Sequence, residues 1–156
     1  MATLTQSESK VSVAMVIHGD LPLLGEKELD LLISQHAALT LAHPSAVSIA
    51  TDRHGRGSNV LMCDPARVPA LSYGRDSCAA HQASAMAMAL PAQVISLPGI
   101  AQDIDTQEDL QRLLAMNALP AAERTLAYLH QNGIAQRLKQ LANGAANTPV
   151  PTWSVV

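Results

Sequence analysis

Three aspartates that follow predicted strands are the first residues in this sequence whose type and spacing could do chemistry. Asp20 stands soon after the first apolar run of the chain, and Asp103 and Asp105 follow the last predicted strand. Carboxylate oxygens suit Mg²⁺, which keeps several waters and joins a few protein oxygens to substrate phosphates. The three carboxylates together could therefore hold a divalent cation. The spacing leaves a second interpretation open, in which Asp20 begins a turn before a proline and Asp105 caps the helix at Thr106.

A second group lies where the turn Gly74-Arg75-Asp76 leads into an alanine-rich segment that starts at Ser77. The first backbone N–H groups of a helix have no intrahelical partner, and together with the helix dipole they favour an anion. Ser77 could cap this helix or bind a carboxylate. His81 comes one helical turn later, so it shares a face with Ser77 and could point into the same site. A lone histidine is also commonly structural, and the sequence leaves that interpretation open.

A third group is the glycine-containing loop Gly55-Arg56-Gly57 with the two residues that follow it, Ser58 and Asn59. Its backbone and the Ser58 hydroxyl could approach an acidic ligand closely, because glycine adds no side chain that would block the approach. The loop is too short for a Walker phosphate-binding loop and lacks the lysine of that motif. Taken alone it is a weak indication of a site.

The composition excludes several classes of partner. The 156 residues carry a formal net charge of −3 and only 2% aromatic residues, so the chain offers neither the cationic field nor the stacking platforms that bind nucleic acid. No apolar stretch is long enough to span a membrane, and the polar N-terminus has no apolar signal segment. Cys63 and Cys78 stand apart without CxxC spacing, which predicts reduced core residues in a cytoplasmic protein.

Strand and helix patterns alternate along the chain and predict how the candidate residues are positioned. With 48% hydrophobic and 15% charged residues, we expect one folded domain over residues 11–142, a disordered lead over 1–10 and a flexible tail over 143–156. The patterns predict strands near residues 11–17, 46–50, 59–63 and 93–97, and helices near 26–42, 77–90, 106–114, 121–129 and 134–141.

This alternation predicts an α/β fold, a three-layer α/β/α sandwich with a mostly parallel sheet. In such sheets ligands gather at the carboxyl ends of the strands. Both acidic motifs, Asp20 and the pair Asp103 and Asp105, lie just past a predicted strand. The predicted fold therefore puts the acidic motifs where sheets of this kind bind their ligands.

Four segments of the chain carry a family resemblance. They read GDLPLL at residues 19–24, GSNVL at 57–61, YGRDSCAAH at 73–81 and DIDTQEDL at 103–110. Taken in this order, they resemble the successive signatures of the 2-phospho-L-lactate guanylyltransferase family, and four motifs in the right order are far more specific than any one of them. The match covers roughly residues 11–115. Ser58 stands where the family usually has threonine, and Tyr73 and Cys78 stand where it usually has phenylalanine.

The resemblance implies a nucleotide-diphospho-sugar transferase-like fold in which Asp20, Asp103 and Asp105 bind Mg²⁺ and form the catalytic centre. The implied reaction is attack of the phosphate of a small phosphorylated carboxylic acid on the α-phosphorus of GTP, with pyrophosphate leaving and metal ions offsetting the charge. The implied acceptor is 2-phospho-L-lactate, phosphoenolpyruvate or 3-phosphoglycerate. The product would be used to build the deazaflavin coenzyme.

The resemblance also implies a site for the acceptor. Ser58, Gly74 and Ser77 match the positions at which the family holds the carboxylate of the acceptor, which agrees with the anion expected at the start of the alanine-rich helix. Asn59 adjoins Ser58, and His81 shares a helix face with Ser77. We therefore count Asn59 and His81 as further candidates for binding the substrate.

The family begins with a strand, a phosphate loop with basic residues and further strands that recognise the guanine, whereas almost nothing precedes Val11 here. We therefore expect an N-terminally truncated version of the fold. Its first strand would have an unpaired edge that invites a second copy of the chain or a partner chain. Two alternatives remain open, namely a noncatalytic or partner-dependent remnant that binds phospho-acids, and another nucleotidyltransferase of the same fold.

Overall fold

The computed structural model describes residues 12–116 and 120–146, and it divides the chain into two compact units. The first unit ends at Asp103 and contains the sheet, and the second starts at Ile104 and is helical in its described part. The division falls between Asp103 and Asp105, two of the three aspartates expected in one metal site. Every candidate site residue except Asp105 lies in the first unit.

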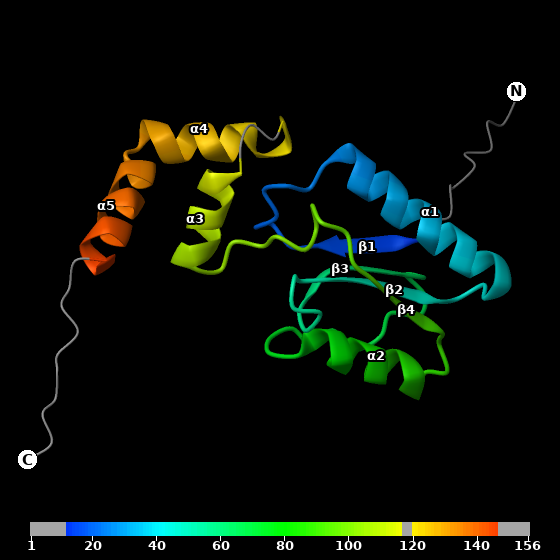
Figure 1. The fold of residues 1–156 in the computed structure, drawn as a ribbon. Helices are drawn as coiled ribbons and strands as arrows, with labels where there is room; N and C mark the ends of the chain where they lie inside the picture. The colour runs from blue at the N-terminus through cyan, green and yellow to red at the C-terminus, as the bar shows by residue number, and fades with distance from the viewer. Residues whose placement is uncertain (1–11, 117–119, 147–156) are drawn as a thin grey trace, which may run out of the picture. The chain divides into compact units, whose positions relative to one another are not determined.

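The first unit alternates strands and helices as the sequence predicted (Figure 1). Helix α1 has the predicted bounds, whereas α2 ends before residue 90 because Ala89 adopts a left-handed backbone conformation with a φ of 52°. The strands are β1 (Ala14–Ile17), β2 (Val47–Thr51), β3 (Ser58–Cys63) and β4 (Ala92–Ile95), and the helices are α1 (Glu26–Ala42) and α2 (Ser77–Ala87).

The four strands form one mixed sheet in the order β1-β3-β2-β4. Strand β3 runs antiparallel to both β1 and β2, and only β2 and β4 pair in parallel. The prediction of a mostly parallel sheet is therefore wrong. The physical reason is the connection between β2 and β3, because residues 52–57 are too few for the crossover that parallel neighbours need. The chain turns back at this connection, and β3 becomes the hairpin partner of β2.

Strands β1, β2 and β4 nevertheless point in one direction, because β1 and β2 both run antiparallel to β3 and β4 runs parallel to β2. Their carboxyl ends and the start of β3 consequently share one edge of the sheet. We call this the carboxyl edge. It carries Asp20 after β1, Ser58 at the start of β3, and the turn that follows β4.

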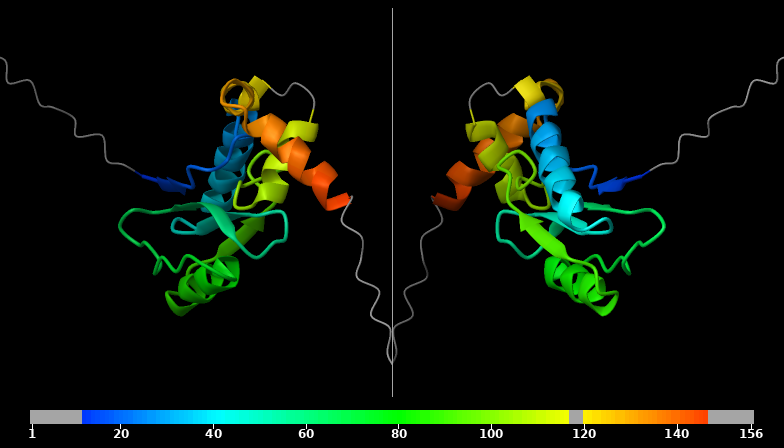
Figure 2. Two further views of the ribbon diagram at one scale, coloured as in Figure 1. Left: turned by 90° about the vertical axis from the view of Figure 1, so that its left-hand side faces the viewer. Right: turned by 90° about the vertical axis from the view of Figure 1, so that its right-hand side faces the viewer.

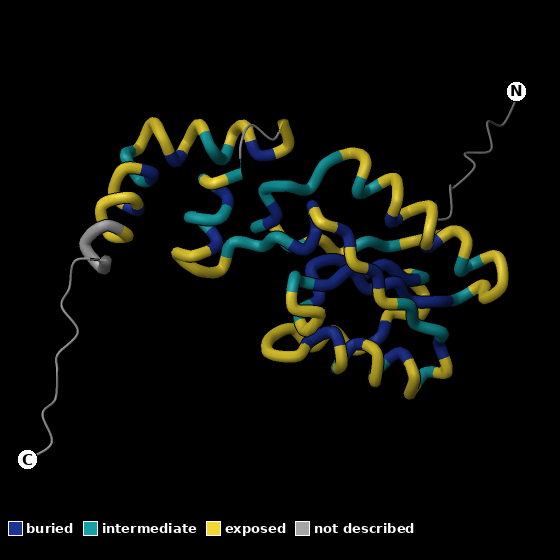
Figure 3. Tube along the Cα trace, viewed as in Figure 1, coloured by how far each residue is buried: buried dark blue, intermediate teal, exposed yellow. Residues whose placement is uncertain are grey.

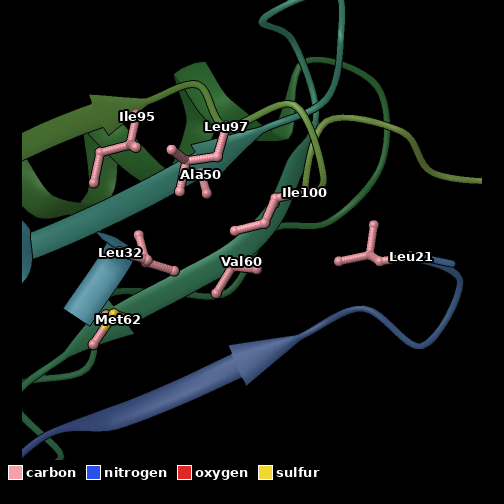
Figure 4. Packing of buried hydrophobic residues seen from close by; sticks show 8 residues of the cluster. All are labelled: Leu21, Leu32, Ala50, Val60, Met62, Ile95, Leu97 and Ile100. Carbon is pink, nitrogen blue, oxygen red and sulfur yellow. The ribbon is translucent and has the colours of Figure 1, made fainter. Parts of the chain in front are cut away.

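Helices α1 and α2 cover opposite faces of the sheet (Figures 1 and 2). Strands β2 and β3 are buried along their whole length between these helices, whose outer faces are exposed (Figure 3). One core cluster joins the sheet to α1 and to the turn after β4 (Figure 4) and consists of Leu21, Leu32, Ala50, Val60, Met62, Ile95, Leu97 and Ile100. The other joins the sheet to α2 and consists of Val47, Ile49, Leu61, Cys63, Cys78, Ala85 and Leu90.

Both cysteines lie in the cluster on the α2 side. Cys63 and Cys78 are buried and free, as the sequence predicted. Burial raises the pKa of both thiols, and the nearby carboxylates of Asp64 and Asp52, respectively, add to the shift. The two thiols therefore act as small apolar core residues.

Strand β1 forms one end of the sheet, where among the described residues it pairs with β3 alone. Val16 and Ile17 of this strand are 37% and 39% exposed. An end strand with exposed apolar side chains is open to pairing with another strand. Association with a second copy or a partner chain through β1 stays a prediction.

The second unit consists of helices within its described residues. They are α3 (Gln107–Ala115), the short 3₁₀ helix η1 (Pro120–Ala122), α4 (Glu123–Gln131) and α5 (Ile134–Ala146). The lead over residues 1–10 and residues 147–156 of the predicted tail lie outside the described residues. Across residues 12–116 and 120–146, no helix combines the length and the apolar character needed to cross a membrane.

Candidate functional site

Backbone pairing brings the segment that carries Asp20 to the start of β3. Beyond Ile17, the N–H of His18 donates to the carbonyl of Asn59 at 3.0 Å, which continues the pairing of β1 with β3 past the end of the strand. Asp20 follows after one further residue, in a turn. The sequence placed Asp20 just past a strand, and the structure agrees.

Asp20 carries a carboxylate oxygen that lacks a partner. Its Oδ1 atom is buried and accepts no hydrogen bond from the described residues. A buried charged oxygen without a partner costs free energy, and such atoms in folded proteins call for an explanation such as a catalytic role or an ion. An oxygen in this state is suited to coordinate a divalent cation.

A β-bulge at the start of β3 decides where Ser58 points. Ala50 of β2 pairs with Val60. The next residue of β2, Thr51, pairs with Ser58, so Asn59 is an extra residue in β3. With regular alternation, Ser58 would lie on the same face as Val60, which packs in the cluster of α1. The bulge instead lets Ser58 reach α2, and bulges near functional sites commonly redirect a side chain in this way.

Asn59, the extra residue of the bulge, is buried and holds the turn after β4. Its side-chain amide donates to the carbonyl of Ile100 at 2.9 Å. Ile100 belongs to the segment that leads from β4 to Asp103, so this bond ties the start of β3 to the chain that carries the second aspartate. Binding of substrate by Asn59 stays a prediction.

Ser58, Ser77 and His81 form a hydrogen-bonded group between β3 and α2. The backbone N–H of Ser58 donates to Oγ of Ser77 at 2.9 Å, and Oγ of Ser58 lies 2.9 Å from Nδ1 of His81. The three side chains belong to residues that are no more than 3% exposed. The structure thus brings together three of the five residues that we expected to bind substrate.

Tyr73 joins this group to the segment after β1. Its ring centroid lies 5.0 Å from that of His18 and 4.9 Å from that of His81. Burial lowers the pKa of His81, and the nearby His18 adds to the shift. Burial also raises the pKa of Tyr73. His81 and Tyr73 are therefore uncharged at neutral pH and pack as neutral rings.

Helix α2 starts without a side-chain cap. The two residues before it that have positive φ are Gly74, at 126°, and Asp76, at 59°. The N–H of Cys78 in the first turn already donates to the carbonyl of Arg56 at 2.8 Å. Ser77 therefore does not cap the helix, which was one of its two expected roles. Binding of the acceptor by Gly74 stays a prediction.

The Ser77 hydroxyl is free to donate. Its oxygen accepts from the N–H of Ser58, and no described residue accepts the hydrogen that it carries. Because Ser77 is buried, a donor without an acceptor costs free energy unless a ligand supplies one. The carboxyl edge therefore offers a buried acceptor without a partner on Asp20 and, on Ser77, a hydroxyl that accepts from Ser58 and has its own hydrogen left to donate. A cation and an anionic oxygen are the ligands that would satisfy them.

The two remaining aspartates belong to different units, since Asp103 ends the first and Asp105 lies in the second. Asp105 is exposed, and its N–H donates to Oδ2 of Asp109 at 3.2 Å. The same oxygen accepts from the N–H and the hydroxyl of Thr106 at 2.9 and 2.8 Å, so Asp109 holds the segment that carries Asp105. Within residues 12–116 and 120–146, no three Asp, Glu, His or Cys side chains gather closely enough to hold a metal ion. A site made of all three aspartates stays a prediction.

Sequence reasoning did not assign His18, Ser72 or Tyr73 to the group at the start of β3, and it did not connect Asp109 with the segment that carries Asp105. The capping-box pattern that starts at Thr106 was a usable signal for Asp109. His18 and Ser72 carry no such signal, because their contacts depend on how residues 64–76 run back along the sheet from the end of β3 to the start of α2.

Comparison with known proteins identifies relatives of this chain. A phosphoenolpyruvate guanylyltransferase of Conexibacter woesei is 35% identical over 124 residues, which are 80% of this chain and 52% of that protein. One of Chloroflexus aurantiacus is 36% identical over 117 residues, 71% of this chain and 54% of that protein. A 3-phospho-D-glycerate guanylyltransferase of Colwellia psychrerythraea is 42% identical over 67 residues, 43% of this chain and 31% of that protein.

The chain spans about half the length of the two phosphoenolpyruvate guanylyltransferases that it matches. A family model described as guanylyl transferase, CofC-like, matches residues 2–146, a range that includes all four motifs. The resemblance that the motifs indicated is confirmed by this match, and the chain belongs to the CofC-like guanylyl transferase family.

Proposed function

We propose that this chain belongs to a metal-dependent guanylyltransferase that joins GMP from GTP to a small phosphorylated carboxylic acid and releases pyrophosphate. The observation that carries the proposal is the buried Oδ1 atom of Asp20, which has no partner among the described residues, at the same edge of the sheet as the Ser77 hydroxyl, whose hydrogen no described residue accepts. One suits a cation and the other suits an anionic oxygen. The names of the relatives, phosphoenolpyruvate and 3-phospho-D-glycerate guanylyltransferase, support the same chemistry.

In this proposal Ser58 and Ser77 bind the carboxylate of the acceptor, and Gly74 lets the backbone approach it. An oxygen of the acceptor phosphate attacks the α-phosphorus of GTP and forms a new phosphorus–oxygen bond. The bond from that phosphorus to the oxygen that bridges to the β-phosphorus breaks, and pyrophosphate takes the electron pair. The acceptor's carboxylate fixes the position of its phosphate, so the two serines orient the nucleophile.

The residues at the carboxyl edge fit a Mg²⁺ ion in part. The buried Oδ1 of Asp20 is an oxygen that lacks a protein partner, and it is the kind of ligand that Mg²⁺ prefers. We propose Asp103 and Asp105 as further ligands, on the basis of the motif that contains them. When bound, Mg²⁺ would offset the negative charge that builds up on the phosphates in the transition state.

The acceptor class follows from the two ends that the site would bind, a carboxylate and a phosphate. Phosphoenolpyruvate, 3-phosphoglycerate and 2-phospho-L-lactate each carry both groups. Because relatives are named for the first two, we take phosphoenolpyruvate as the first probe. The product would be a guanylylated phospho-acid, and we propose that it is used in building the deazaflavin coenzyme.

Calorimetric titration of the purified chain with phosphoenolpyruvate and with GTP, each with and without Mg²⁺, tests the proposal. Magnesium-dependent binding of both would support a complete site. Binding of phosphoenolpyruvate alone would favour the second candidate, a noncatalytic or partner-dependent chain. Binding of a sugar phosphate in place of any phospho-acid would favour another nucleotidyltransferase.

Two serines of α2 offer a matched pair of variants for the same titration. Ser77 Oγ accepts from the N–H of Ser58 at 2.9 Å, and Ser84 Oγ accepts from the N–H of Ala70 at 2.7 Å. Each substitution to alanine removes a side-chain oxygen that accepts a hydrogen bond from one backbone N–H, but only Ser77 lies at the carboxyl edge. We expect Ser77→Ala to weaken phosphoenolpyruvate binding about tenfold, because it removes a hydrogen bond to a charged group, and Ser84→Ala to leave it unchanged. Equal effects of the two would count against the assigned site.

A further inference from the structure

His81 is a buried histidine whose two ring nitrogens both have protein partners. The residue is 0% exposed. The backbone nitrogen of Ser72 lies 2.9 Å from Nε2, and Oγ of Ser58 lies 2.9 Å from Nδ1. One residue of α2 thus connects the start of β3 to the loop that precedes the helix.

The partner of Nε2 fixes the tautomer of this ring. A backbone N–H can only donate, so Nε2 has to carry the lone pair that accepts from Ser72. A neutral imidazole has one lone-pair nitrogen and one N–H, so the proton of His81 is on Nδ1. Burial lowers the pKa of His81 and thereby disfavours the doubly protonated ring. Nδ1–H therefore donates to the hydroxyl oxygen of Ser58.

This direction of donation leaves the hydroxyl hydrogen of Ser58 unused. The oxygen accepts from His81, and no described residue accepts the hydrogen that it carries. Ser77 is in the same condition, because its oxygen accepts from the N–H of Ser58. The group therefore contains two buried hydroxyl donors, and a buried donor without an acceptor is unusual unless a ligand or water completes it.

We infer that His81 is a positioning residue for the acceptor, because its Nδ1–H holds the Ser58 hydroxyl as a donor toward an anionic oxygen of the phosphorylated carboxylic acid. The inference rests on the proposed function and deepens it. In this role His81 acts through Ser58 and does not itself contact the acceptor. If the tautomer were reversed, Ser58 would donate to His81 and present only a lone pair to an anion, which repels it.

A second buried histidine provides the contrast. Nδ1 of His36 in α1 lies 2.8 Å from Oγ of Ser48 in β2. Oγ of Ser48 also accepts from the side-chain amide of Gln93 at 3.0 Å. The Ser48 hydroxyl can therefore send its hydrogen to His36, and no donor is left for a ligand. His36 is the matched structural control for His81.

Two substitutions separate the roles of the two nitrogens of His81. The amide of asparagine can place an N–H at the position of Nδ1, so His81→Asn keeps the donor to Ser58 and loses the acceptor for Ser72. The amide of glutamine can place an oxygen at the position of Nε2, so His81→Gln keeps the acceptor for Ser72 and loses the donor to Ser58. The two variants thus differ in the one bond that the inference concerns.

The measurement is the Kd of phosphoenolpyruvate for the full chain by calorimetry with Mg²⁺, together with the free energy of unfolding of each variant in urea. We expect His81→Gln to raise the Kd about tenfold or more and His81→Asn to raise it less than about threefold. We expect His36→Asn to leave the Kd unchanged although it lowers the stability. Nitrogen NMR of the free wild-type chain should find the proton of His81 on Nδ1.

Several results would overturn the inference. Equal losses of affinity in the two His81 variants, or losses that follow the loss of stability across the His81 and His36 variants, would mean a purely structural role. An NMR result that places the proton of His81 on Nε2 in the wild-type chain would by itself contradict the inference. If the wild-type chain and His81→Gln bind phosphoenolpyruvate equally well, the inference about His81 is wrong and the proposed function still stands. If the wild-type chain binds no phospho-acid, both the inference and the proposed function are wrong.

Discussion

The surroundings of Asp20 are not those that would make the fold most stable. The fold buries one of its carboxylate oxygens and gives that oxygen no partner among the described residues. Packing alone does not favour this arrangement, because a buried carboxylate oxygen without a partner costs free energy. Strain kept at one residue is common where a ligand relieves it. Asp20 is therefore the position at which stability and function should be separable.

We expect Asp20→Asn to raise the free energy of unfolding of the ligand-free chain by about 1 kcal/mol, because a neutral amide of the same shape is cheaper to bury than a charge. The same variant should lose magnesium-dependent binding of phosphoenolpyruvate. Urea unfolding and calorimetry measure the two effects. Asp30→Asn, at an exposed position of α1, is the control and should change stability by less than about 0.5 kcal/mol. A destabilised Asp20→Asn would contradict this account.

At the residue scale, the sequence identified residue types and their place after strands, but not their partners. Asp20 and Ser77 were chosen as candidates because each stands at the end or start of an element, which a pattern of apolar residues predicts. The bond between His81 and Ser72 was not predictable, because it depends on the path of residues 64–76. Nor was the role of Asn59, whose amide donates to a carbonyl far along the chain.

At the element scale, the start of α3 is a well-defined helix cap. Thr106 Oγ accepts from the N–H of Asp109 at 3.3 Å, and Asp109 Oδ2 accepts from the N–H of Thr106 at 2.9 Å. Asp109 also forms a salt bridge with Arg112 at 3.0 Å. This reciprocal capping box fixes the first turn of α3 and, through Asp109, the backbone of Asp105.

We expect Thr106→Ala to destabilise α3 by about 1 kcal/mol, the usual cost of losing a threonine cap. Hydrogen exchange of the amides of α3 should speed up correspondingly, whereas amides of α2 should not change. Thr40→Ala is the control, because the exposed Thr40 hydroxyl only donates back to the carbonyl of Ala37 within α1. If hydrogen exchange of the α3 amides accelerated similarly in Thr106→Ala and Thr40→Ala, the capping box would contribute little to the stability of α3.

The elements themselves were largely predictable, and their pairing was not. Helix α1 and helix α3 follow from local patterns and were located correctly, to within one residue at each end of α3. The mixed sheet was missed because apolar runs give no strand direction, and only the short 52–57 connection hinted that β3 returns beside β2. The bulge at Asn59 was also missed. Its single extra residue decides whether Ser58 faces α1 or α2, which is why the site could not be assembled from the sequence.

At the scale of the whole molecule, two buried histidines make stability depend on pH. His36 packs between α1 and β2, and His81 packs between α2 and β3, so each serves a different face of the sheet. Burial lowers the pKa of both below the ordinary value of 6.5, with His18 adding to the shift of His81. The folded chain therefore holds both histidines in their neutral form.

The sign of the effect follows from proton uptake. Below about pH 6.5 the unfolded chain binds protons on these histidines that the folded chain does not, so their contribution to stability is complete above that pH and is lost as the pH falls toward the lowered pKa values. The free energy of unfolding should fall by up to about 1.4 kcal/mol per pH unit for each histidine. Urea unfolding between about pH 7.5 and pH 5.5 measures this slope.

We expect His36→Gln to flatten the pH dependence, because it removes one of the two proton-binding groups, although it also lowers stability at neutral pH. His54→Gln is the control, since His54 is exposed in the loop between β2 and β3, and it should leave the slope unchanged. If His36→Gln retained the full wild-type slope, His36 would not be held neutral in the folded chain. Because His81 stays intact in this variant, binding of phosphoenolpyruvate at neutral pH should persist, which separates the acid sensitivity of the fold from the chemistry at its carboxyl edge.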